Sequence, residues 1–335
     1  MNIFAFRRPG ESSIKTGGSS ELTEGICRNS FIIAPFYAPD QKILSIPDRE
    51  KFDFDEIDNL IYSDYQNHIS SLFPFPKSSG SKESHRLEVE KIREEIFNGN
   101  LKKCVAARCE VGTGRINIHD TFFSLCEAYP EAYIFLFHTS ASGTWLGASP
   151  ELLLARKGTS IRSMALAGTR PANSNEAWSE KNIAEHRIVI DFLSSQFKDS
   201  GIITEVEKTQ TVNAGPVEHL RTLVNGLLKS EFRPEEILRK LSPTPALSGS
   251  PKEKAIRLIS EYEEFSRGFY GGFCGWTSCE ESYEYYVNLR SVRIEPERYC
   301  IFAGGGIMQD SDPESEWEET EHKALTIKRQ MKFYN

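Results

Sequence analysis

Five short apolar segments constrain the fold of this chain more than any other feature of its sequence. Each is rich in aromatic residues or bounded by turn residues, and each is too short for a good helix, so all five are predicted to be strands. They lie at residues 104–107, 133–137, 151–155, 285–289 and 299–303. A fold built around these segments needs helices or further sheet to cover their apolar faces.

The segments between these strands have helical character. Apolar residues at mostly helical spacing predict a helix over 83–97, with Gly99 as its stop signal. Strands and helices do not alternate strictly, which favours an α+β layered fold over a doubly wound one. The polar stretch 74–84 separates an amino-terminal portion, 1–84, from the main body. Further helices are predicted at 118–128, 179–198, 216–229, 234–240, 251–265 and 313–333.

Composition excludes several classes of protein. Lys and Arg total 40 against 48 Asp and Glu, giving a net charge of −8, which argues against a nucleic-acid binder. No apolar run reaches the roughly 18 residues of a membrane span, and the first residues do not resemble a secretory signal. The seven cysteines are odd in number and form no CxxC pair, which fits a reducing compartment. We therefore expect a cytoplasmic protein with no nucleic-acid or membrane partner.

The carboxy-terminal region holds the most informative pattern. Asp312 followed by Pro313 is a strong helix start, and Glu316, Glu319 and Lys323 then share one helix face. Two carboxylates on one face could hold a hard divalent cation; an acidic first turn with a Glu–Lys ion pair explains the same spacing. Upstream, three glycines at 304–306 close a strand, as expected where backbone approaches another group closely, although a tight turn remains the alternative.

Three further candidates stand on their own chemistry. Glu185, next to His186 on the helix that starts near Ser179, could be a metal ligand or part of a solvated face. Lys103 enters an apolar strand, where burial would lower its pKa and make it a base, unless it reaches out from a strand edge. Glu151 follows a turn and could be a general acid or simply a charge at a strand start.

The order of these segments resembles the chorismate-utilising enzymes. That family includes isochorismate and salicylate synthases and the large subunits of anthranilate and aminodeoxychorismate synthases, and the resemblance covers roughly 85–335. The segments that carry it are Lys103-Cys-Val-Ala-Ala-Arg108, Gly147-Ala-Ser-Pro-Glu151, Leu166-Ala-Gly-Thr-Arg170, Glu180-Lys-Asn-Ile-Ala-Glu-His186, Pro243-Thr-Pro-Ala-Leu-Ser-Gly249, Phe269-Tyr-Gly-Gly-Phe-Cys-Gly-Trp276, Asn288-Leu-Arg290, Ala303-Gly-Gly-Gly-Ile307 and Glu316-Trp-Glu-Glu-Thr320.

The resemblance implies a fold and a site. It implies an α+β fold of two antiparallel sheets packed together and flanked by helices, as one domain over 1–335 with 85–335 as its catalytic core. It further implies an enzyme that binds chorismate and Mg²⁺. By position, the metal ligands would be Glu185, Glu319 and Glu316, and the substrate-binding residues would be Arg290, Lys323, Gly304, Ala303, Thr169, Ala246 and Tyr270.

The resemblance also assigns the two proton-transfer groups. Lys103 matches the base that activates a water for attack at C2 of the ring, and Glu151 matches the acid that protonates the departing C4 hydroxyl. A neutral lysine and a protonated glutamate need opposite pKa shifts from values near 10.4 and 4.3. Burial disfavours the charged form of both groups, so one dry pocket would serve both roles.

Few residues separate the members of the family. Lys103 argues against ammonia-using anthranilate synthases, and Ala167 replaces the nucleophilic lysine common in aminodeoxychorismate synthases. Isochorismate and salicylate synthases remain, and they share the base, the acid and the metal site. The family pattern favours the enzyme that stops at isochorismate, and the resemblance favours menaquinone over siderophore synthesis as its purpose. We expect a monomer without a glutaminase subunit. Ser242, where histidine is usual before Pro-Thr-Pro, and Asn182, where aspartate is usual, depart from the family pattern.

Two readings from other classes remain as alternatives. The chain could bind chorismate without catalysis, which the presence of Lys103, Glu151, Glu185 and Glu319 together argues against. It could also be a glycine-rich nucleotide-binding module. That reading requires the glycines at 304–306 to open a helix directly, whereas Pro313 places the helix start several residues later.

Overall fold

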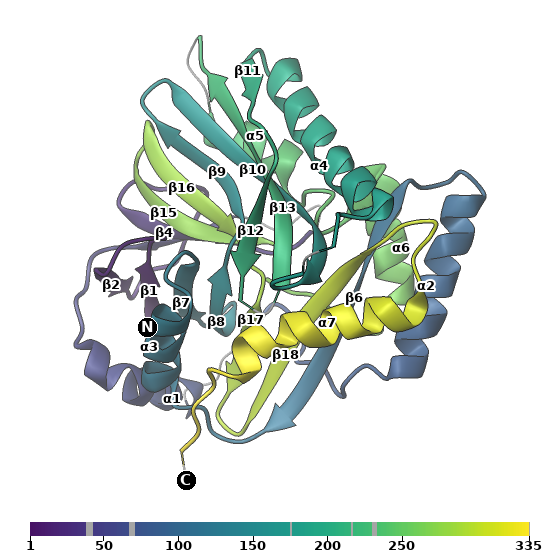
Figure 1. Ribbon diagram of the computed structural model, residues 1–335. Coiled ribbons are helices and arrows are strands. Elements are labelled where there is room, and N and C mark those ends of the chain that lie inside the picture. The colour runs from purple at the N-terminus through teal and green to yellow at the C-terminus, as the bar shows by residue number, and fades with distance from the viewer. Residues whose placement is uncertain (38–42, 67–70, 175, 216, 230–232, 335) are drawn as a thin grey trace.

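The strands of the chain form two antiparallel sheets that pack against each other and carry helices on their outer faces (Figure 1). The computed structural model describes residues 1–37, 43–66, 71–174, 176–215, 217–229 and 233–334. Every pairing between the named strands is antiparallel, and the α+β prediction of two packed antiparallel sheets is confirmed. Within the described residues, no helix is both long and apolar enough to cross a membrane.

The first sheet has eight strands in the order β14-β6-β18-β17-β8-β7-β1-β2. The two long strands β6 and β18 pair along their whole shared length, from Cys104 opposite Ile307 to Thr113 opposite Arg298. The strands are β1 (Asn2–Arg7), β2 (Ile14–Ser19), β6 (Lys103–Thr113), β7 (Tyr133–Thr139), β8 (Gly143–Ser149), β14 (Gly249–Ser250), β17 (Ser291–Glu295) and β18 (Arg298–Ile307).

The second sheet has ten strands, nine of them in the order β11-β13-β10-β9-β16-β15-β4-β5-β3, with β12 pairing alongside β13. Strands from the amino-terminal 84 residues thus enter both sheets, because β1 pairs with β7 and β4 pairs with β15. The strands are β3 (Thr23–Glu24), β4 (Ser30–Ala34), β5 (Leu44–Pro47), β9 (Leu152–Lys157), β10 (Ser160–Pro171), β11 (Ile203–Val206), β12 (Gln210–Ala214), β13 (Val217–Leu227), β15 (Phe273–Cys279) and β16 (Ser282–Val287).

The helices begin close to the predicted residues wherever the sequence holds a clear start signal. In α7, the Asp312 side chain accepts a hydrogen bond from Ser315 N at 2.9 Å and Pro313 occupies the first turn, as predicted. Helix α7 lies on β18, and α4 lies on β10 (Figure 1). The helices are the 3₁₀ helix η1 (Phe54–Glu56) and the α-helices α1 (Ile57–Gln66), α2 (Lys82–Phe97), α3 (Ile118–Ala128), α4 (Glu180–Asp199), α5 (Pro234–Leu241), α6 (Lys252–Tyr262) and α7 (Pro313–Lys328).

The helix predicted over 216–229 is wrong, because this region forms strand β13. Leu220, Leu223 and Val224 have the spacing of a helix face, which is why the sequence pattern favours a helix. In the structure, β13 pairs with β10 on one edge and with β11 and β12 on the other. From Leu220 onward its residues alternate between buried and partly exposed positions. Pairing on both edges of the strand outweighs the local spacing.

Aromatic side chains fill the space between the two sheets. Phe4 of β1 stacks on Phe31 of β4 with ring centroids 5.3 Å apart, and Tyr133 of β7 stacks on Tyr286 of β16 at 4.1 Å. Each pair joins one sheet to the other, and such contacts add to the apolar area that the rings bury. This aromatic layer fixes the two sheets relative to each other and so fixes any site built from both.

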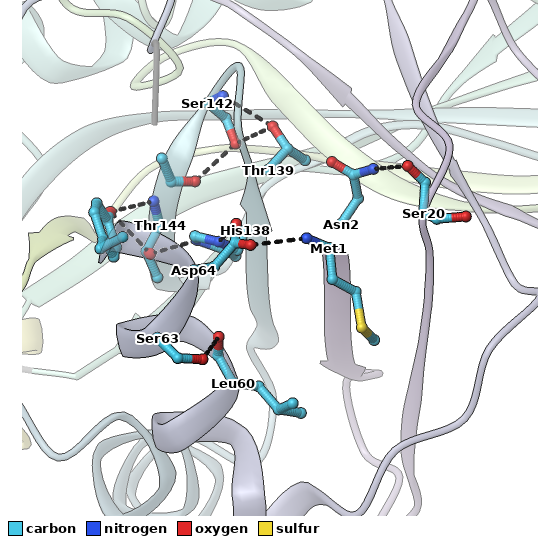
Figure 2. Close-up of polar contacts among 12 residues, drawn as sticks. Met1, Asn2, Ser20, Leu60, Ser63, Asp64, His138, Thr139, Ser142 and Thr144 are labelled. Carbon is cyan, nitrogen blue, oxygen red and sulfur yellow. Dashed lines mark hydrogen bonds and ion pairs between the residues drawn. The ribbon is translucent and has the colours of Figure 1, made fainter. Parts of the chain in front are cut away.

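A partly buried chain of polar contacts ties the amino terminus and α1 to the first sheet (Figure 2). Asp64 accepts from the Met1 ammonium at 3.0 Å, and its other oxygen lies 3.0 Å from His138 Nε2. His138 Nδ1 in turn contacts Thr144 Oγ1 at 2.9 Å. The hydrogen bond with His138 outweighs burial and holds the pKa of Asp64 at about 2, so the carboxylate stays charged.

Candidate active site

A cavity lies between β6 and β18 of the first sheet and β10 and β13 of the second. All seven residues predicted to bind substrate line it, and so do Glu151 and Glu185. The seven are Thr169, Ala246, Tyr270, Arg290, Ala303, Gly304 and Lys323. The sequence therefore predicted which distant segments meet at one cavity.

Glu185 lines this cavity, and Lys103 lies beside it, buried behind the cavity wall. Lys103, at the start of β6, is completely buried, and its Nζ lies 2.9 Å from Glu185 Oε1 on α4. Gly306 of β18 lies directly beneath them: a Cβ there would come within 2.1 Å of Glu185 Oε1 and 2.8 Å of Lys103 Cε. Only glycine leaves room for the pair, which accounts for the third glycine of the motif.

Nearby lysines determine the state of Glu185. Burial acts to raise the pKa of Glu185, but the charge and hydrogen bond of Lys103, together with the charges of Lys181 and Lys323, outweigh burial, and the pKa is lowered. Glu185 is thus a buried carboxylate with an oxygen turned toward the glycine strand. The alternative that Glu185 belongs to a solvated helix face does not hold, since the residue is buried.

Helix α7 brings two further carboxylates to the same strand, and each is paired with a lysine. Glu319 Oε1 accepts from Lys323 Nζ at 2.7 Å, and Glu316, which is 1% exposed, accepts from Lys181 Nζ of α4. Burial, together with the charge of Glu319, raises the pKa of Glu316 to about 7. Lys323 also donates to the carbonyl of Gly304 at 2.9 Å.

This carboxylate group fits a hard divalent cation in its chemistry. The second oxygen of Glu316 is buried with no hydrogen-bond partner and faces Gly305, 3.1 Å from where a Cβ would be. Carboxylate oxygens are the ligands that Mg²⁺ prefers. As the side chains stand, a lysine contacts each of the three glutamates. No three His, Cys, Asp or Glu residues of the described ranges are arranged to hold a metal.

Glu151 lies on the cavity wall without such a lysine contact. It precedes β9, is 2% exposed, and its Oε1 has no hydrogen-bond partner. Burial raises its pKa to about 8, even though the positive charges of Lys103, Lys323 and Arg290 oppose that rise. Glu151 therefore carries its proton at neutral pH, as a general acid requires.

Arg290 enters the cavity from a strained turn. Its φ of +48° is unusual for a residue with a side chain, and such strain is concentrated at functional sites. The guanidinium is buried, which lowers the pKa of Arg290 to about 10, and it donates to the carbonyl of Ala214 and to His219 Nε2. A cationic fork held inside a cavity can bind a carboxylate through two parallel hydrogen bonds.

The sequence prediction missed His219, which lies on the misassigned strand β13 and lines the cavity. Because arginine only donates, His219 Nε2 accepts from Arg290 at 2.6 Å, so the ring proton is on Nδ1. Nδ1 donates to the carbonyl of Gly168 at 3.1 Å. Burial and the charge of Arg290 hold the pKa of His219 well below its usual value, so the ring is neutral and orients Arg290.

The two departures from the family pattern have visible contacts. Asn182 donates from its amide nitrogen to the carbonyl of Thr169 at 3.2 Å, a bond that an aspartate could not make. Ser242 ends α5, and its carbonyl accepts from Lys252 Nζ at 2.7 Å. Lys181 is a further residue that the sequence argument did not single out, although it lies one turn before Glu185, where a lysine can reach the same carboxylate group.

Comparison with known proteins places the chain in a family. A family model described as chorismate binding enzyme matches residues 37–332. The chain belongs to the chorismate-binding enzyme family. Among solved structures, this chorismate-binding enzyme is similar to DhbC from Bacillus anthracis, with a TM-score of 0.81 at 24% identity over 98% of this chain and 96% of that one. The menaquinone-specific isochorismate synthase MenF from Escherichia coli gives 0.78 at 22% identity, over 98% and 88%. At these identities the likeness supports the fold alone.

Relatives in sequence are isochorismate and anthranilate synthases. This chorismate-binding enzyme is 36% identical over 250 residues to isochorismate synthase MenF of Bacillus subtilis, over 70% of this chain and 52% of the relative. It is 29% identical to the vibriobactin-specific isochorismate synthase of Vibrio cholerae, over 75% and 67%. It is 32% identical to anthranilate synthase component 1 of Streptomyces coelicolor, over 71% and 49%. The match thus spans about half the length of the Bacillus subtilis relative.

Proposed function

We propose that this protein is an isochorismate synthase that uses Mg²⁺ to isomerise chorismate. The observation that carries the proposal is a cavity lined by a protonated Glu151 and by Glu185, whose carboxylate lies 2.9 Å from the buried Nζ of Lys103. An acid–base pair of this kind suits the exchange of one hydroxyl group for another. The sequence relationship to MenF of Bacillus subtilis points the same way and favours a role in menaquinone synthesis.

In the proposed reaction, one water enters and one water leaves. Lys103 acts in its neutral form, after losing to solvent the proton that it shares with Glu185 in the resting site. Its Nζ then takes a proton from a water whose oxygen bonds to ring carbon C2. The ring double bonds shift, the bond between C4 and its hydroxyl breaks, and Glu151 gives its proton to the departing oxygen. Each positioned proton transfer contributes about 10²–10⁴-fold in rate. Afterwards the proton on Lys103 returns to Glu151 through solvent, and the product has the atoms of the substrate.

The remaining residues of the site bind the substrate or hold the metal. Arg290 and Lys323 supply the positive charge for them, and His219 fixes the direction of the Arg290 fork. Glu185, Glu319 and Glu316 would hold the Mg²⁺, which supplies charge to neutralise a substrate carboxylate when bound. Ala303, Gly304, Thr169, Ala246 and Tyr270 shape the surface on which the ring lies.

The direct test is a product assay. The protein is incubated with chorismate and Mg²⁺, with and without an ammonium salt, and isochorismate, salicylate with pyruvate, and anthranilate are separated. We expect isochorismate in both arms and its loss on chelation of the metal with EDTA. Salicylate with pyruvate would assign the protein to the salicylate synthases. Anthranilate that appears only with ammonium would assign it to the anthranilate synthases.

We further propose that the chain acts as a cytoplasmic monomer, without a glutaminase subunit, and that residues 1–84 belong to the same folding unit as the catalytic core. The entry of β1 and β4 into the two sheets supports the last point. Use of water rather than ammonia, for which Lys103 argues, would make a glutaminase unnecessary. Size-exclusion chromatography at working concentrations checks the monomer, and a dimer would contradict it.

A further inference from the structure

Strand β6 has a neighbouring strand on one edge only for most of its length. Strand β18 pairs with it from Cys104 onward, whereas on the other edge β14 pairs only with Lys103 and Cys104. Beyond that point the backbone groups facing away from β18 need other partners, since buried backbone groups are almost always hydrogen-bonded. The first of them, Val105 N–H, donates to the carbonyl of Ser248 at 2.8 Å.

Two side chains supply the next partners along this edge. Arg267 Nη2 donates to the carbonyl of Val105 at 2.9 Å, and Glu263 Oε1 accepts from Ala107 N–H at 3.1 Å. Glu263 and Arg267 also pair with each other, with Oε2 and Nε 2.8 Å apart, and each side chain is only 2% exposed. The ion pair therefore occupies the place of a missing strand beside β6.

The same guanidinium reaches a second segment of the cavity wall. Arg267 Nη1 donates to the carbonyl of Leu247 at 2.7 Å. Leu247 and Ala246 line the cavity, as does Val105, which lies two residues after Lys103 on β6. One rigid fork thus links the strand that carries Lys103 to the loop that forms another part of the wall.

We propose that Glu263 and Arg267 are positioning residues that set where the β6 strand with Lys103 lies relative to the loop with Ala246 and Leu247. The inference rests on the proposed function in so far as Lys103 is the base. Arginine suits this role because its planar group donates in fixed directions to two carbonyls and to a carboxylate at once. It also lies over the ring of Phe36, 4.5 Å from the centroid, which restricts its movement.

The test compares Arg267→Lys with Arg293→Lys. Arg293 is a matched control. Like Arg267 it is a buried arginine, and it lies on strand β17 of the first sheet, away from the cavity. It is ion-paired with Glu295 and donates to the carbonyls of Phe73 and Pro74. Both variants lose hydrogen bonds to backbone. Only Arg267→Lys removes the link between β6 and the cavity loop, because an ammonium on a flexible stem cannot hold both carbonyls and the carboxylate in place.

For Arg267→Lys we expect kcat for isochorismate formation to fall about 100-fold, the effect of a misplacement of about 1 Å, with a smaller change in KM for chorismate. Amide hydrogen exchange should quicken at 103–109 and 244–248. In Arg293→Lys, kcat and exchange at these two segments should match wild type, while the melting temperature should fall in both variants because each loses buried hydrogen bonds. An Arg267→Lys variant whose kcat and exchange equal those of Arg293→Lys would overturn the proposal.

The exchange measurement separates this inference from the proposed function. If the wild-type protein formed no isochorismate, the proposed function would fail, and unchanged exchange in Arg267→Lys would still refute the positioning role. If Arg267→Lys did not fold, Glu263→Gln would carry the test. Its amide oxygen can still accept from Ala107 N–H while the charge that holds Arg267 is gone, so faster exchange at 244–248 and a roughly tenfold loss of kcat are expected. If exchange at 244–248 and kcat of Glu263→Gln equalled the wild-type values, the positioning role would be refuted.

Discussion

Glu151 and Glu185 line the same cavity and are nearly equally buried, yet they are held in opposite states of protonation. Burial pushes the pKa of both carboxyls upward. For Glu151 burial prevails and the pKa is about 8, whereas for Glu185 the hydrogen bond of Lys103 at 2.9 Å and the charges of Lys103, Lys181 and Lys323 together prevail and the pKa is lowered. The comparison teaches that contact with cations, rather than the degree of burial, decides which glutamate is an acid and which can hold a metal.

The two kinds of carboxyl group in the cavity therefore have distinct chemistry. Glu151 has a neutral carboxyl that can give up a proton. The other three glutamates, Glu185, Glu316 and Glu319, are each paired with a lysine and lie against glycines that leave them space. Changing Glu151 and changing Glu185 should therefore have different effects, and this makes the comparison testable.

The largest effect is expected from Lys103→Ala, which removes the proposed base and the partner of Glu185. We expect kcat to fall toward 10⁴-fold, the upper end of what a positioned proton acceptor contributes. Chorismate and Mg²⁺ should still bind, as measured by calorimetry. Lys328→Ala, which removes a lysine that pairs with Glu110 outside the cavity, is the control. Undiminished turnover in Lys103→Ala would exclude Lys103 as the base.

Glu151→Gln tests the proposed general acid. The amide keeps the shape of a neutral carboxylic acid but has no acidic proton, so we expect kcat to fall by about 10² or more while chorismate accumulates on the protein. Thermal stability near pH 7 should not fall below that of wild type, because the carboxyl it replaces is neutral in the folded protein and ionised only in the unfolded chain. A variant with a normal rate would remove the acid role.

Glu185→Gln, unlike Glu151→Gln, should lower the stability of the folded protein. The change leaves the buried ammonium of Lys103 without its counter-charge, and loss of one partner of a buried pair costs about 3–5 kcal/mol. We expect a lower free energy of unfolding by denaturant at pH 7 and weaker Mg²⁺ binding. Equal stability of Glu185→Gln and Glu151→Gln would refute the contrast drawn between the two glutamates.

The raised pKa of Glu151 also predicts a pH dependence of stability. The pKa of Glu151 is raised on folding, so folded protein holds a proton that unfolded chain has lost, and stability falls as pH rises from about 4.5 to about 8. Each unit of pKa difference is worth about 1.4 kcal/mol. Relative to wild type, Glu151→Gln should therefore gain stability with rising pH in this window. Parallel stability curves for the two proteins would contradict the raised pKa.

Features set by neighbouring residues could be predicted from the sequence. The start of α7 at Pro313 depends on a cap and a proline within one turn, and the shared face of Glu316, Glu319 and Lys323 depends on helical spacing. The matched segments also predicted which residues line the cavity. In each case the signal lies in a short stretch of chain or in a pattern that the family fixes.

Features set by contacts between distant residues could not be read in this way. Lys103 and Glu185 lie on different elements, and only the packing of α4 against the sheet shows that they pair. His219 was missed because β13 is specified by strands on both of its edges rather than by its own spacing. Strands such as β1 and β4 were missed for the same reason, since their burial between aromatic layers depends on the opposite sheet.

The protonation state of Glu151 can be measured directly by infrared difference spectroscopy between the wild-type protein and Glu151→Gln. The account predicts the carbonyl band of a protonated carboxylic acid at pH 7, which gives way to carboxylate bands as the pH rises through about 8. Carboxylate bands alone at pH 7 would contradict it, because Glu151 would then have no proton to give to the departing hydroxyl.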